Sequence, residues 1–393
     1  MKIVHVITDL SVGGAETMLV RLISTSRRDG LQHVVISLSS QAPLAERLLA
    51  LGVEVRILGM GRGAPSARLF RRLVQWLDEL EPDVVQTWMY HADLLGGTAT
   101  YVAQTMRWLR GAAVRRPALL WGVHHTDLRL TGSSRATRWI ARACALMSSR
   151  VPDMIVCCAE SARSSHRQGG YCPQRMTVIH NGIDLERFRA DPVCRETLRR
   201  SLGIELNAPL VGIVGRYHPV KDYGTFVAAM RVVLDAMPQC RFVMAGQGLD
   251  PGNRELVALL DATQTSYACR LLGPQAEPQT LLAGLDVFCL SSKSEGLPTV
   301  IGEAMACEVP CVATDVGDTA LLIGATGCVV RPEDPQALGR ALIAMLNRSR
   351  AERTALGHAA RSRINSLFSI EASWRRYEET YVAALGRRQR PAG

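Results

Sequence analysis

Two glutamates, Glu295 and Glu303, lie in the segment Ser291–Ala306, which follows the apolar run Val287–Leu290. Pro298 suits the start of a helix, because its ring fixes φ and its missing N–H would be unpaired there. Glu295 then lies on the loop before the helix and Glu303 about one turn inside it. One carboxylate is placed to reach the hydroxyls of a sugar and the other to accept both hydroxyls of a ribose. A helix-dipole effect alone would explain Glu295, but not Glu303 in an otherwise apolar helix.

A second loop, Gly215–Asp222, follows the strand-like run Leu210–Val214 and carries Arg216 and Lys221. A planar guanidinium and a compact ammonium just before a helix suit a diphosphate. Only three of the 46 basic residues are lysines. A lysine where the sequence otherwise uses arginine favours a specific role over that of a general cation.

The first half has two further candidate loops. Gly13 and Gly14 follow the first strand-like run and open a helix, a turn that lets the backbone approach an anion. An ordinary turn is the alternative, and the G-x-G-x-x-G dinucleotide fingerprint is absent. His124 and His125 follow the run Leu119–Val123, at a strand end where catalytic groups gather in such folds. Chance placement is the alternative, and a metal pair would need ligands that the sequence does not supply.

Short apolar runs alternate with helical patterns in both halves, which predicts parallel sheets covered by helices on both faces. At 393 residues the chain fits two domains. We expect the α/β class, with two facing doubly wound Rossmann-like domains at residues 1–188 and 189–368 and a final helix and tail at 369–393. The predicted strands are Ile3–Ile7, His33–Leu38, Glu54–Leu58, Val84–Thr87, Leu119–Val123, Met154–Cys158, Leu210–Val214, Arg241–Ala245, Arg270–Leu272, Val287–Leu290, Cys311–Ala313 and Gly327–Val330.

The composition is that of a globular protein, with 47% hydrophobic and 21% charged residues. The net charge is +10, and nearly all of the excess lies in the first half. This distribution favours an anionic partner, with an arginine-biased solvated face as the alternative. The eleven cysteines are scattered without a C-x-x-C pair, which predicts buried free thiols and no zinc site. The start lacks a signal-peptide pattern, so we expect a cytoplasmic protein.

With these residues in hand, the chain resembles the retaining glycosyltransferases of the GT-B fold, specifically glycosyltransferase family 4 (glycosyl transferases group 1). The resemblance covers almost the whole chain, and the motifs in this order are specific. It rests on Gly13-Gly14-Ala15-Glu16, His124, Asn181-Gly182-Ile183-Asp184, Gly215-Arg216 with Lys221, Glu295-Gly296-Leu297-Pro298, Glu303-Ala304-Met305-Ala306-Cys307 and Val309–Asp318.

The resemblance implies roles for the matching residues. Gly14 would lie near the donor phosphates and His124 near the transferred sugar, while the final helix would cross back onto the first domain. Arg216 and Lys221 would bind the diphosphate and stabilise its charge as it leaves. The implied catalytic residues are therefore His124, Arg216, Lys221 and Glu295. The implied donor-binding residues are Gly14, Gly296, Leu297 and Pro298 at the phosphate, Glu303 at the ribose, and Leu272 and Gly273 at the base.

Two positions depart from the family pattern. Glu308 stands where glycine is usual, and we expect it at a helix end, where a left-handed residue is common. Pro274-Gln275 follows Gly273 where an arginine is frequent, which weakens any inference about the base.

The implied reaction is a sugar transfer with retention, in which the leaving phosphate takes the proton of the acceptor. The sequence has no Asp-x-Asp motif, so we expect no metal and no cofactor, with Arg216, Lys221 and the helix terminus stabilising the diphosphate instead. The expected donor is a UDP-sugar, or else a GDP-sugar. The expected acceptor is a lipid-linked glycan in cell-surface polysaccharide synthesis.

We also expect peripheral binding to the anionic inner face of the membrane. The expected contact residues are arginines with tryptophans among them: Arg107, Arg110, Arg115, Arg116, Arg129, Arg135, Arg138 and Arg142, with Trp108, Trp121 and Trp139.

Three alternatives remain open from the sequence. A GT-B epimerase would act on the nucleotide sugar without an acceptor. A pyridoxal-phosphate phosphorylase would need a Schiff-base lysine, whereas Lys221 and Lys293 are better placed for phosphate. A basic membrane- or nucleic-acid-binding protein with an inactive donor site fits the charge, but aromatic residues make up only 5% of the chain, which disfavours a nucleic-acid partner.

Overall fold

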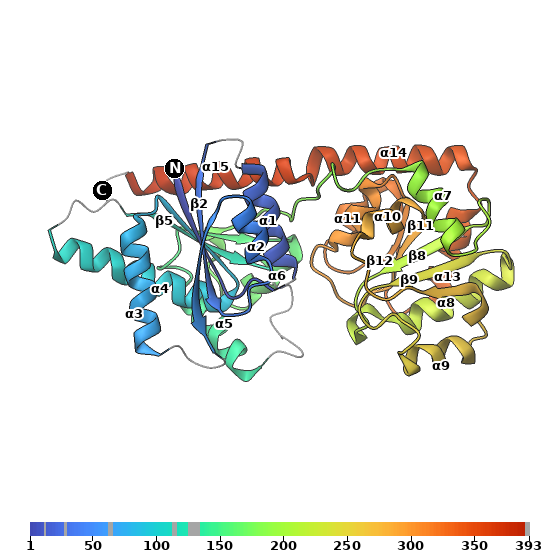
Figure 1. The fold of residues 1–393 in the computed structure, drawn as a ribbon, viewed down its shortest axis with the longest axis horizontal. Coiled ribbons are helices and arrows are strands. Elements are labelled where there is room, and N and C mark those ends of the chain that lie inside the picture. Colours follow the sequence, from blue (N-terminus) through green and yellow to red (C-terminus); the bar gives the residue numbers. More distant parts are fainter. Residues whose placement is uncertain (12, 27–29, 62–65, 112–115, 125–133, 390–393) are drawn as a thin grey trace. The chain divides into compact units, whose positions relative to one another are not determined.

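The computed structural model describes residues 1–11, 13–26, 30–61, 66–111, 116–124 and 134–389. The chain divides into two compact units, one comprising Met1–Gly182 with Ile370–Gly393 and the other Ile183–Ser369. Each unit has its own parallel sheet with helices packed on its faces (Figure 1), which confirms the predicted α/β class. The division lies at Gly182–Ile183, whereas the sequence places the break at 188.

The first unit is built on a seven-stranded sheet with the order β3-β2-β1-β4-β5-β6-β7. Its central strands are buried along nearly their whole length, because helices cover both faces of the sheet. The strands are β1 Lys2–Ile7, β2 Gln32–Ser39, β3 Glu54–Met60, β4 Val84–Trp88, β5 Ala118–Val123, β6 Met154–Cys157 and β7 Met176–Val178. The helices are α1 Gly14–Ser26, α2 Ala45–Ala50, α3 Ala67–Leu80, α4 Tyr90–Leu109, α5 Arg135–Met147 and α6 Glu160–Gln168.

The final helix α15 (Ile370–Gln389) belongs to this first unit. Trp374, Tyr377 and Tyr381 on α15 are buried in the same apolar core as residues of β1 and α1. Its packing confirms the prediction that the C-terminal helix returns to the first domain.

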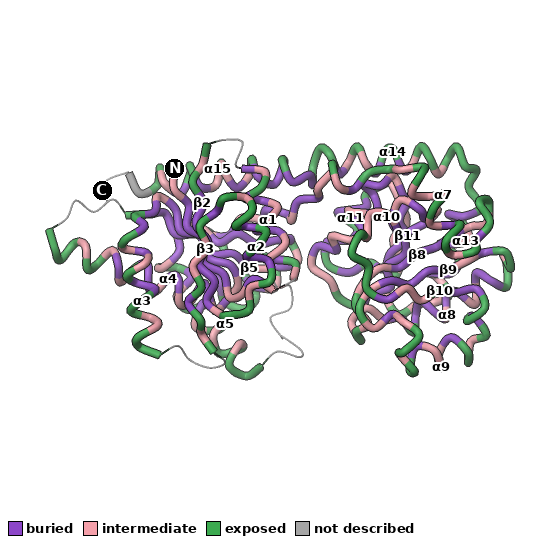
Figure 2. The backbone as a smooth tube through the Cα atoms, in the orientation of Figure 1, coloured by how far each residue is buried: buried purple, intermediate pink, exposed green. Residues whose placement is uncertain are grey.

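The second unit is built on a six-stranded sheet with the order β10-β9-β8-β11-β12-β13. Buried backbone is concentrated in the strands, with exposed residues on the outer faces of the helices (Figure 2). The strands are β8 Leu210–Val214, β9 Arg241–Ala245, β10 Cys269–Leu271, β11 Val287–Leu290, β12 Cys311–Thr314 and β13 Cys328–Val330. The helices are α7 Pro192–Ser201, α8 Tyr223–Ala236, α9 Arg254–Ala262, α10 Pro278–Ala283, α11 Thr299–Ala306, α12 Thr319–Ile323, α13 Pro335–Leu346 and α14 Arg350–Leu367.

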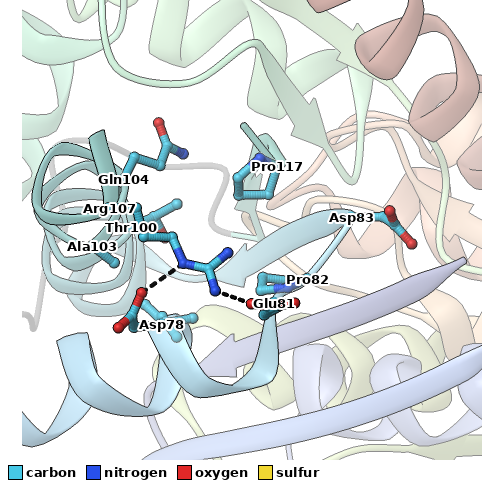
Figure 3. Close-up of a pocket in the computed structure, with 10 residues that line it drawn as sticks. Asp78, Glu81, Pro82, Asp83, Thr100, Ala103, Gln104, Arg107 and Pro117 are labelled. Carbon is cyan, nitrogen blue, oxygen red and sulfur yellow. Dashed lines mark hydrogen bonds and ion pairs between the residues drawn. The ribbon is translucent and has the colours of Figure 1, made fainter. Parts of the chain in front are cut away.

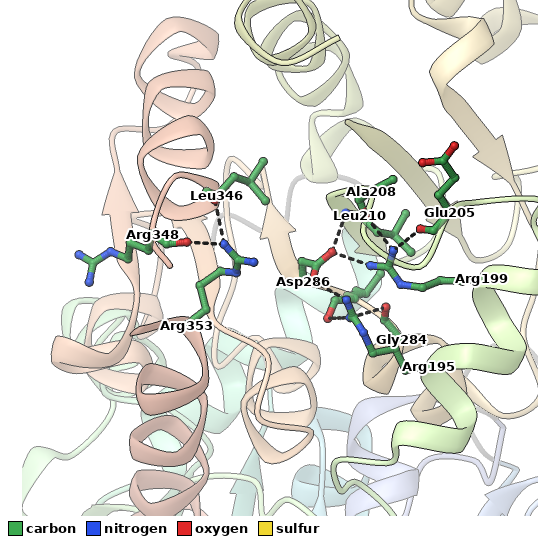
Figure 4. Close-up of polar contacts among 11 residues, drawn as sticks. Arg195, Arg199, Glu205, Ala208, Leu210, Gly284, Asp286, Leu346, Arg348 and Arg353 are labelled. Carbon is green, nitrogen blue, oxygen red and sulfur yellow. Dashed lines mark hydrogen bonds and ion pairs between the residues drawn. The ribbon is translucent and has the colours of Figure 1, made fainter. Parts of the chain in front are cut away.

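A buried charge cluster anchors α7 to the amino-terminal edge of the second sheet (Figure 4). Asp286, just before β11, accepts hydrogen bonds from Arg195 at 2.7 Å, from Arg199 at 2.5 Å and from the backbone N–H of Leu210 at 2.9 Å. The Arg199 side chain is fully buried, and burial lowers its pKa. Removing one partner of such a cluster leaves a buried charge uncompensated. We therefore assign the cluster a structural role.

All eleven cysteines are free thiols and most are buried, as the sequence predicts. Burial raises the pKa of the Cys269 thiol to about 12. Such thiols pack as small apolar side chains.

Candidate functional site

In the second unit, the predicted site residues gather where the strand order reverses. Strands β8 and β11 are neighbours in the sheet, although β9 and β10 lie between them in the sequence. Helices that follow β8 and β11 therefore leave this point in opposite directions, which opens the loops beyond the carboxyl ends of both strands. Lys221 follows β8 and Glu295 follows β11, so the topology places the two predicted loops side by side.

Lys221 and Glu295 form an ion pair, with Lys221 Nζ lying 2.6 Å from Glu295 Oε1. The side chains are 21% and 14% exposed. Ser292 Oγ donates a second hydrogen bond to the same carboxylate oxygen at 2.6 Å. An ammonium has three donors, so Lys221 keeps donors for a second anion while Glu295 holds it.

The Glu295 loop is fixed from both sides by backbone contacts. The N–H of Lys293 donates to Val220 O at 2.8 Å, and Ser291 Oγ donates to Lys221 O at 2.8 Å. From the other side, Thr314 Oγ1 donates to Ser292 O at 2.6 Å. The loop is therefore a rigid platform that joins the ends of β8, β11 and β12.

Gly317 is required for the close approach of this loop to the one after β12. Its φ is +57°, and a Cβ there would lie 2.3 Å from Glu295 O and 2.4 Å from Gly296 O. The N–H of Asp318 donates to Gly296 O at 2.8 Å. Any side chain at position 317 would push the Glu295–Gly296 backbone out of place.

Arg216 is exposed on the loop after β8 and makes no hydrogen bond or ion pair within the residues that the structure describes. Nearby, Tyr223 begins α8 and stacks on Tyr217, with ring centroids 5.5 Å apart. The Tyr223 hydroxyl is buried and lacks a hydrogen-bond partner among the described residues. Burial, and next the charge of Glu295, raise the pKa of Tyr223, so this hydroxyl keeps its proton. The site thus holds a guanidinium and a hydroxyl as available donors.

Glu303 lies inside α11, as the sequence predicts, and is half-buried. Leu297 and Pro298 are buried just before the helix, next to the half-buried Gly296. The first N–H groups of any helix lack acceptors within it and favour an anion there. Glu308 lies just past the helix end with a φ of +62°, which confirms the left-handed conformation expected for it.

Leu272 and Gly273 follow β10 and join the same edge of the sheet. Gly273 has a φ of +65°, and its carbonyl accepts from the N–H of Gly246 at 2.8 Å. Gly246, after β9, is in turn close to the first loop, because a Cβ on it would lie 1.9 Å from Gly215 O. The loops after β8, β9 and β10 therefore form a continuous surface.

In the first unit, Gly14 and His124 follow β1 and β5. Gly14 is the exposed first residue of α1 and has open space where a Cβ would be. His124 is half-buried and stacks on Trp88, with ring centroids 5.0 Å apart and planes at 20°. His125, which the sequence groups with His124, lies outside the described residues.

The structure contradicts part of the expected membrane-contact surface of the first unit. Trp121 is fully buried in β5, so its expected place at a membrane interface is wrong. Arg107 is bound to Asp78 at 2.7 Å and also to Glu81, and Arg110 is bound to Asp78 at 2.9 Å. These acids neutralise much of the charge on the end of α4. Arg115 and Arg129 lie outside the described residues.

Figure 3 shows Arg107 between α3 and α4, at a pocket of about 230 Å³ lined also by Asp83 and Pro117. This pocket is at the amino-terminal edge of the sheet, because Asp83 and Pro117 precede β4 and β5. His124 follows the carboxyl end of β5, so the pocket is not part of its surroundings.

Exposed apolar and basic side chains remain on α4 and α5. Trp108 and Trp139 are 66% and 68% exposed, and Leu109 and Leu146 are 71% and 80% exposed. On α5 the exposed stripe consists of Arg135, Arg138, Trp139, Arg142 and Leu146, and the helix carries no acidic residue.

Several residues of the site were not identified from the sequence. Ser292, Thr314 and Gly317 lie within segments that the sequence motifs include, but the sequence indicated no role of its own for any of them, and none for Tyr223 either. Their contacts depend on strands that are distant in sequence. The available signal was positional, since each residue lies at or beyond the carboxyl end of a strand, on the sheet edge where the predicted residues lie.

The chain matches two family profiles. Residues 12–187 match the profile described as Glycosyltransferase Family 4, and residues 208–348 match the one described as Glycosyl transferases group 1. It is 32% identical over 225 residues to the D-inositol 3-phosphate glycosyltransferase of Mycobacterium avium, a match that covers 55% of this chain and 50% of that enzyme. The matched region thus spans about half the length of that curated relative.

Solved structures share the fold. The HepE protein of Anabaena, in complex with UDP and glucose, has a TM-score of 0.81 and 21% identity over 98% of this chain and 100% of that one. The lipopolysaccharide outer core galactosyltransferase WaaB, in its apo form, has a TM-score of 0.70 and 15% identity over 98% of this chain and 99% of that one.

Proposed function

The chain belongs to the family 4 glycosyltransferases of the GT-B fold, and we propose that it transfers a sugar from a nucleotide-sugar donor to an acceptor. The observation that carries this proposal is the Lys221–Glu295 pair at the point where the strand order reverses. It combines a fixed cation for a diphosphate with a carboxylate for sugar hydroxyls. Arg216, which has no partner in the part of the chain that the structure describes, and the start of α11 add further charge stabilisation.

In the proposed reaction the bond between C1 of the sugar and the phosphate oxygen breaks, and a bond from C1 to the acceptor oxygen forms on the same face. The departing phosphate oxygen takes the acceptor proton, so no side chain serves as general base. Arg216, Lys221 and the N–H groups before α11 stabilise the charge on the nucleotide diphosphate, and the reaction needs neither metal nor cofactor. Glu295 orients the sugar and Lys221, and Glu303 accepts the ribose hydroxyls.

We further propose a UDP-sugar as donor, with a GDP-sugar as the second choice. The similarity to a protein solved with UDP and glucose supports this choice. A thermal-shift screen of UDP-, GDP- and ADP-sugars tests it, because a ligand that binds only the folded state raises Tm. A larger shift with GDP- or ADP-sugars than with UDP-sugars would contradict the choice.

The proposed acceptor is a lipid-linked glycan of a cell-surface polysaccharide, presented at the cytoplasmic face of an anionic membrane. The stripe on α5 and the exposed end of α4 support this proposal, because arginines with tryptophan and leucine suit an anionic lipid surface. No helix in the described ranges has both the length and the apolar character needed to cross a bilayer.

Two experiments test the proposal. Nucleotide release from the donor should depend on added acceptor, whereas acceptor-independent conversion of the nucleotide sugar would indicate an epimerase instead. In flotation with anionic vesicles, Trp139→Ala should bind less than the wild type, and Tyr267→Ala, an exposed aromatic of the second unit, should bind equally. Equal binding of the wild type to neutral and anionic vesicles would contradict membrane recognition.

A further inference from the structure

A fully buried tryptophan lies behind His124 in the first unit. Trp88 ends β4, and one face of its ring stacks on His124, with centroids 5.0 Å apart. The Trp88 ring also stacks on Tyr377 of α15, with centroids 6.1 Å apart and planes at 26°. The plane of the Trp88 ring thus limits the orientation of His124.

The Trp88 ring is itself held by a chain of buried hydrogen bonds. Indole Nε1–H can only donate, and it lies 3.3 Å from His5 Nδ1. His5 Nε2 therefore carries the proton and donates to His33 Nδ1 at 3.0 Å. His33 Nε2–H then donates to Ser26 Oγ at 2.8 Å, and Ser26 donates to Ile23 O at 3.1 Å. Every link has one donor and one acceptor, so the chain has a single direction and assigns both tautomers.

Both imidazoles must be neutral for this chain to exist, because a protonated ring has no acceptor nitrogen. Burial, and next the charge of His33, lower the pKa of His5 well below its usual value. Burial lowers the pKa of His33 to about 4. Their surroundings therefore maintain the neutral forms at neutral pH.

The backbone beside Trp88 is strained in a way that typically marks a functional position. Met89 has a φ of +75° and a ψ of 157°, a region that side chains disfavour. Its N–H donates to Gly122 O at 2.8 Å, and its carbonyl accepts from the N–H of Asp93 at 2.9 Å. The buried Asp93 carboxyl also accepts from Thr87 Oγ1 at 2.5 Å. These bonds fix the point at which Trp88 leaves the strand.

We propose that Trp88 is a positioning residue for His124, and that the chain through His5, His33 and Ser26 fixes the indole ring in the required plane. The inference rests on the proposed sugar transfer, and on the place near the transferred sugar that the family resemblance implies for His124. Trp88 does not touch the substrate. It acts by restricting the His124 ring, and α15 contributes through Tyr377.

The first test compares two substitutions of the same kind in buried strands. Trp88→Phe removes the N–H and keeps an aromatic ring, whereas Trp121→Phe changes an equally buried tryptophan on the neighbouring strand β5. We expect Trp88→Phe to lower kcat for transfer about tenfold or more, because a small misplacement of a side chain that holds the substrate in its reacting geometry is costly. The KM for the donor should change less than twofold. Trp121→Phe should retain the kcat of the wild type.

The second test asks whether Trp88 and His5 act together. His5→Leu removes the acceptor, whereas the amide oxygen of His5→Asn can replace Nδ1. We expect His5→Asn to retain more of kcat than His5→Leu, and the Trp88→Phe/His5→Leu double variant to lose no more than Trp88→Phe alone. In the wild type, nitrogen NMR should identify the Nε2–H tautomer for both His5 and His33.

Additive losses in the double variant, Nδ1–H tautomers, or equal effects of Trp88→Phe and Trp121→Phe would overturn the inference. Circular dichroism spectra and Tm measurements show whether each variant is folded. If the wild type transfers no sugar from any donor, the proposed function fails. If the wild type is active and Trp88→Phe is equally active, only this inference fails.

Discussion

Lys221 Nζ lies 2.6 Å from Glu295 Oε1, although the two residues are in different loops of the second unit. They meet because β8 and β11 are adjacent in the sheet. Each residue therefore positions the other, and neither is expected to act as an acid or base. In the proposed reaction this pair divides the roles of the site, with charge stabilisation by Lys221 and Arg216 and orientation by Glu295.

Lys221→Ala is expected to lower kcat about a hundredfold or more, because it removes a fixed cation from the departing diphosphate. Lys293→Ala is the matched control, since Lys293 is more exposed and binds Glu333 at 2.7 Å. It should stay within about threefold of the wild type. Steady-state kinetics with a saturating acceptor measure both variants. Equal losses for the two lysines would contradict a specific role for Lys221.

Glu295→Gln is expected to lower kcat without removing a limb from the pH profile of the reaction. The amide loses the ion pair with Lys221 but keeps an oxygen that can accept from Ser292. Measuring kcat across pH for the wild type and the variant tests this expectation. Loss of an ionisation in the variant alone would identify Glu295 as a titrating catalytic group, contrary to the role assigned here.

Gly317→Ala is expected to weaken donor binding at least tenfold, because the added Cβ would collide with Glu295 O and Gly296 O. Gly203→Ala is the control, since its φ of +64° is similar and no atom lies within 4 Å of the added Cβ. Both changes carry a backbone cost of about 1–2 kcal/mol. Calorimetric titration of the donor should show a loss for Gly317→Ala only. Unchanged affinity in both variants would show that this loop does not shape the donor site.

Gly357→Ala is expected to destabilise the protein by about 1–3 kcal/mol, although alanine is the better helix former. A Cβ at position 357 of α14 would lie 2.1 Å from Glu308 O. At Gly386 of α15 no atom lies within 4 Å, so Gly386→Ala should leave the free energy of unfolding unchanged or raise it by up to about 1 kcal/mol. Urea unfolding measures both. A stabilising Gly357→Ala would mean that α14 does not pack so closely on the end of α11.

The free energy of unfolding should fall as pH is lowered from about 6.5 to 4. Burial lowers the pKa of native His33 to about 4, so it stays neutral in this range, whereas in the unfolded chain its pKa is the ordinary histidine value of about 6.5. The unfolded state thus binds more protons, and the stability present above 6.5 is progressively lost. Between pH 7 and pH 5 the wild type should lose about 2 kcal/mol more than His33→Gln. Urea unfolding at pH 7 and pH 5 measures this difference. If His33 were not buried in its neutral form, the wild type and His33→Gln would lose the same free energy of unfolding.

The fold could be predicted from the sequence because the central strands are largely apolar runs. The ends of the expected strands lie at most two residues from those of the observed ones. Strand β7 (Met176–Val178) was missed, because three residues are too few to show a pattern. Trp121 was misplaced because arginines surround it in the sequence, whereas its strand is central in the sheet. Composition does not show which tryptophan is buried.

Separate sequence motifs predicted Lys221, Glu295 and the other candidate residues, but they did not predict the contacts between those residues. Lys221 meets Glu295 because β8 and β11 are neighbours in the sheet. This strand order cannot be read from the sequence alone. The strained Met89 and the chain from Trp88 to Ser26 likewise depend on packing between β1, β2 and β4. Glu308 was predictable, because a helix end favours a left-handed residue whatever the surroundings.

The central claim is that the second unit binds a nucleotide sugar through Lys221 and Arg216. Calorimetric titration of a UDP-sugar into the full chain and into the Lys221→Ala variant tests it most directly. We predict saturable binding to the wild type and at least tenfold weaker binding to the variant. Absence of binding of UDP-, GDP- and ADP-sugars to the folded wild-type protein would contradict the account.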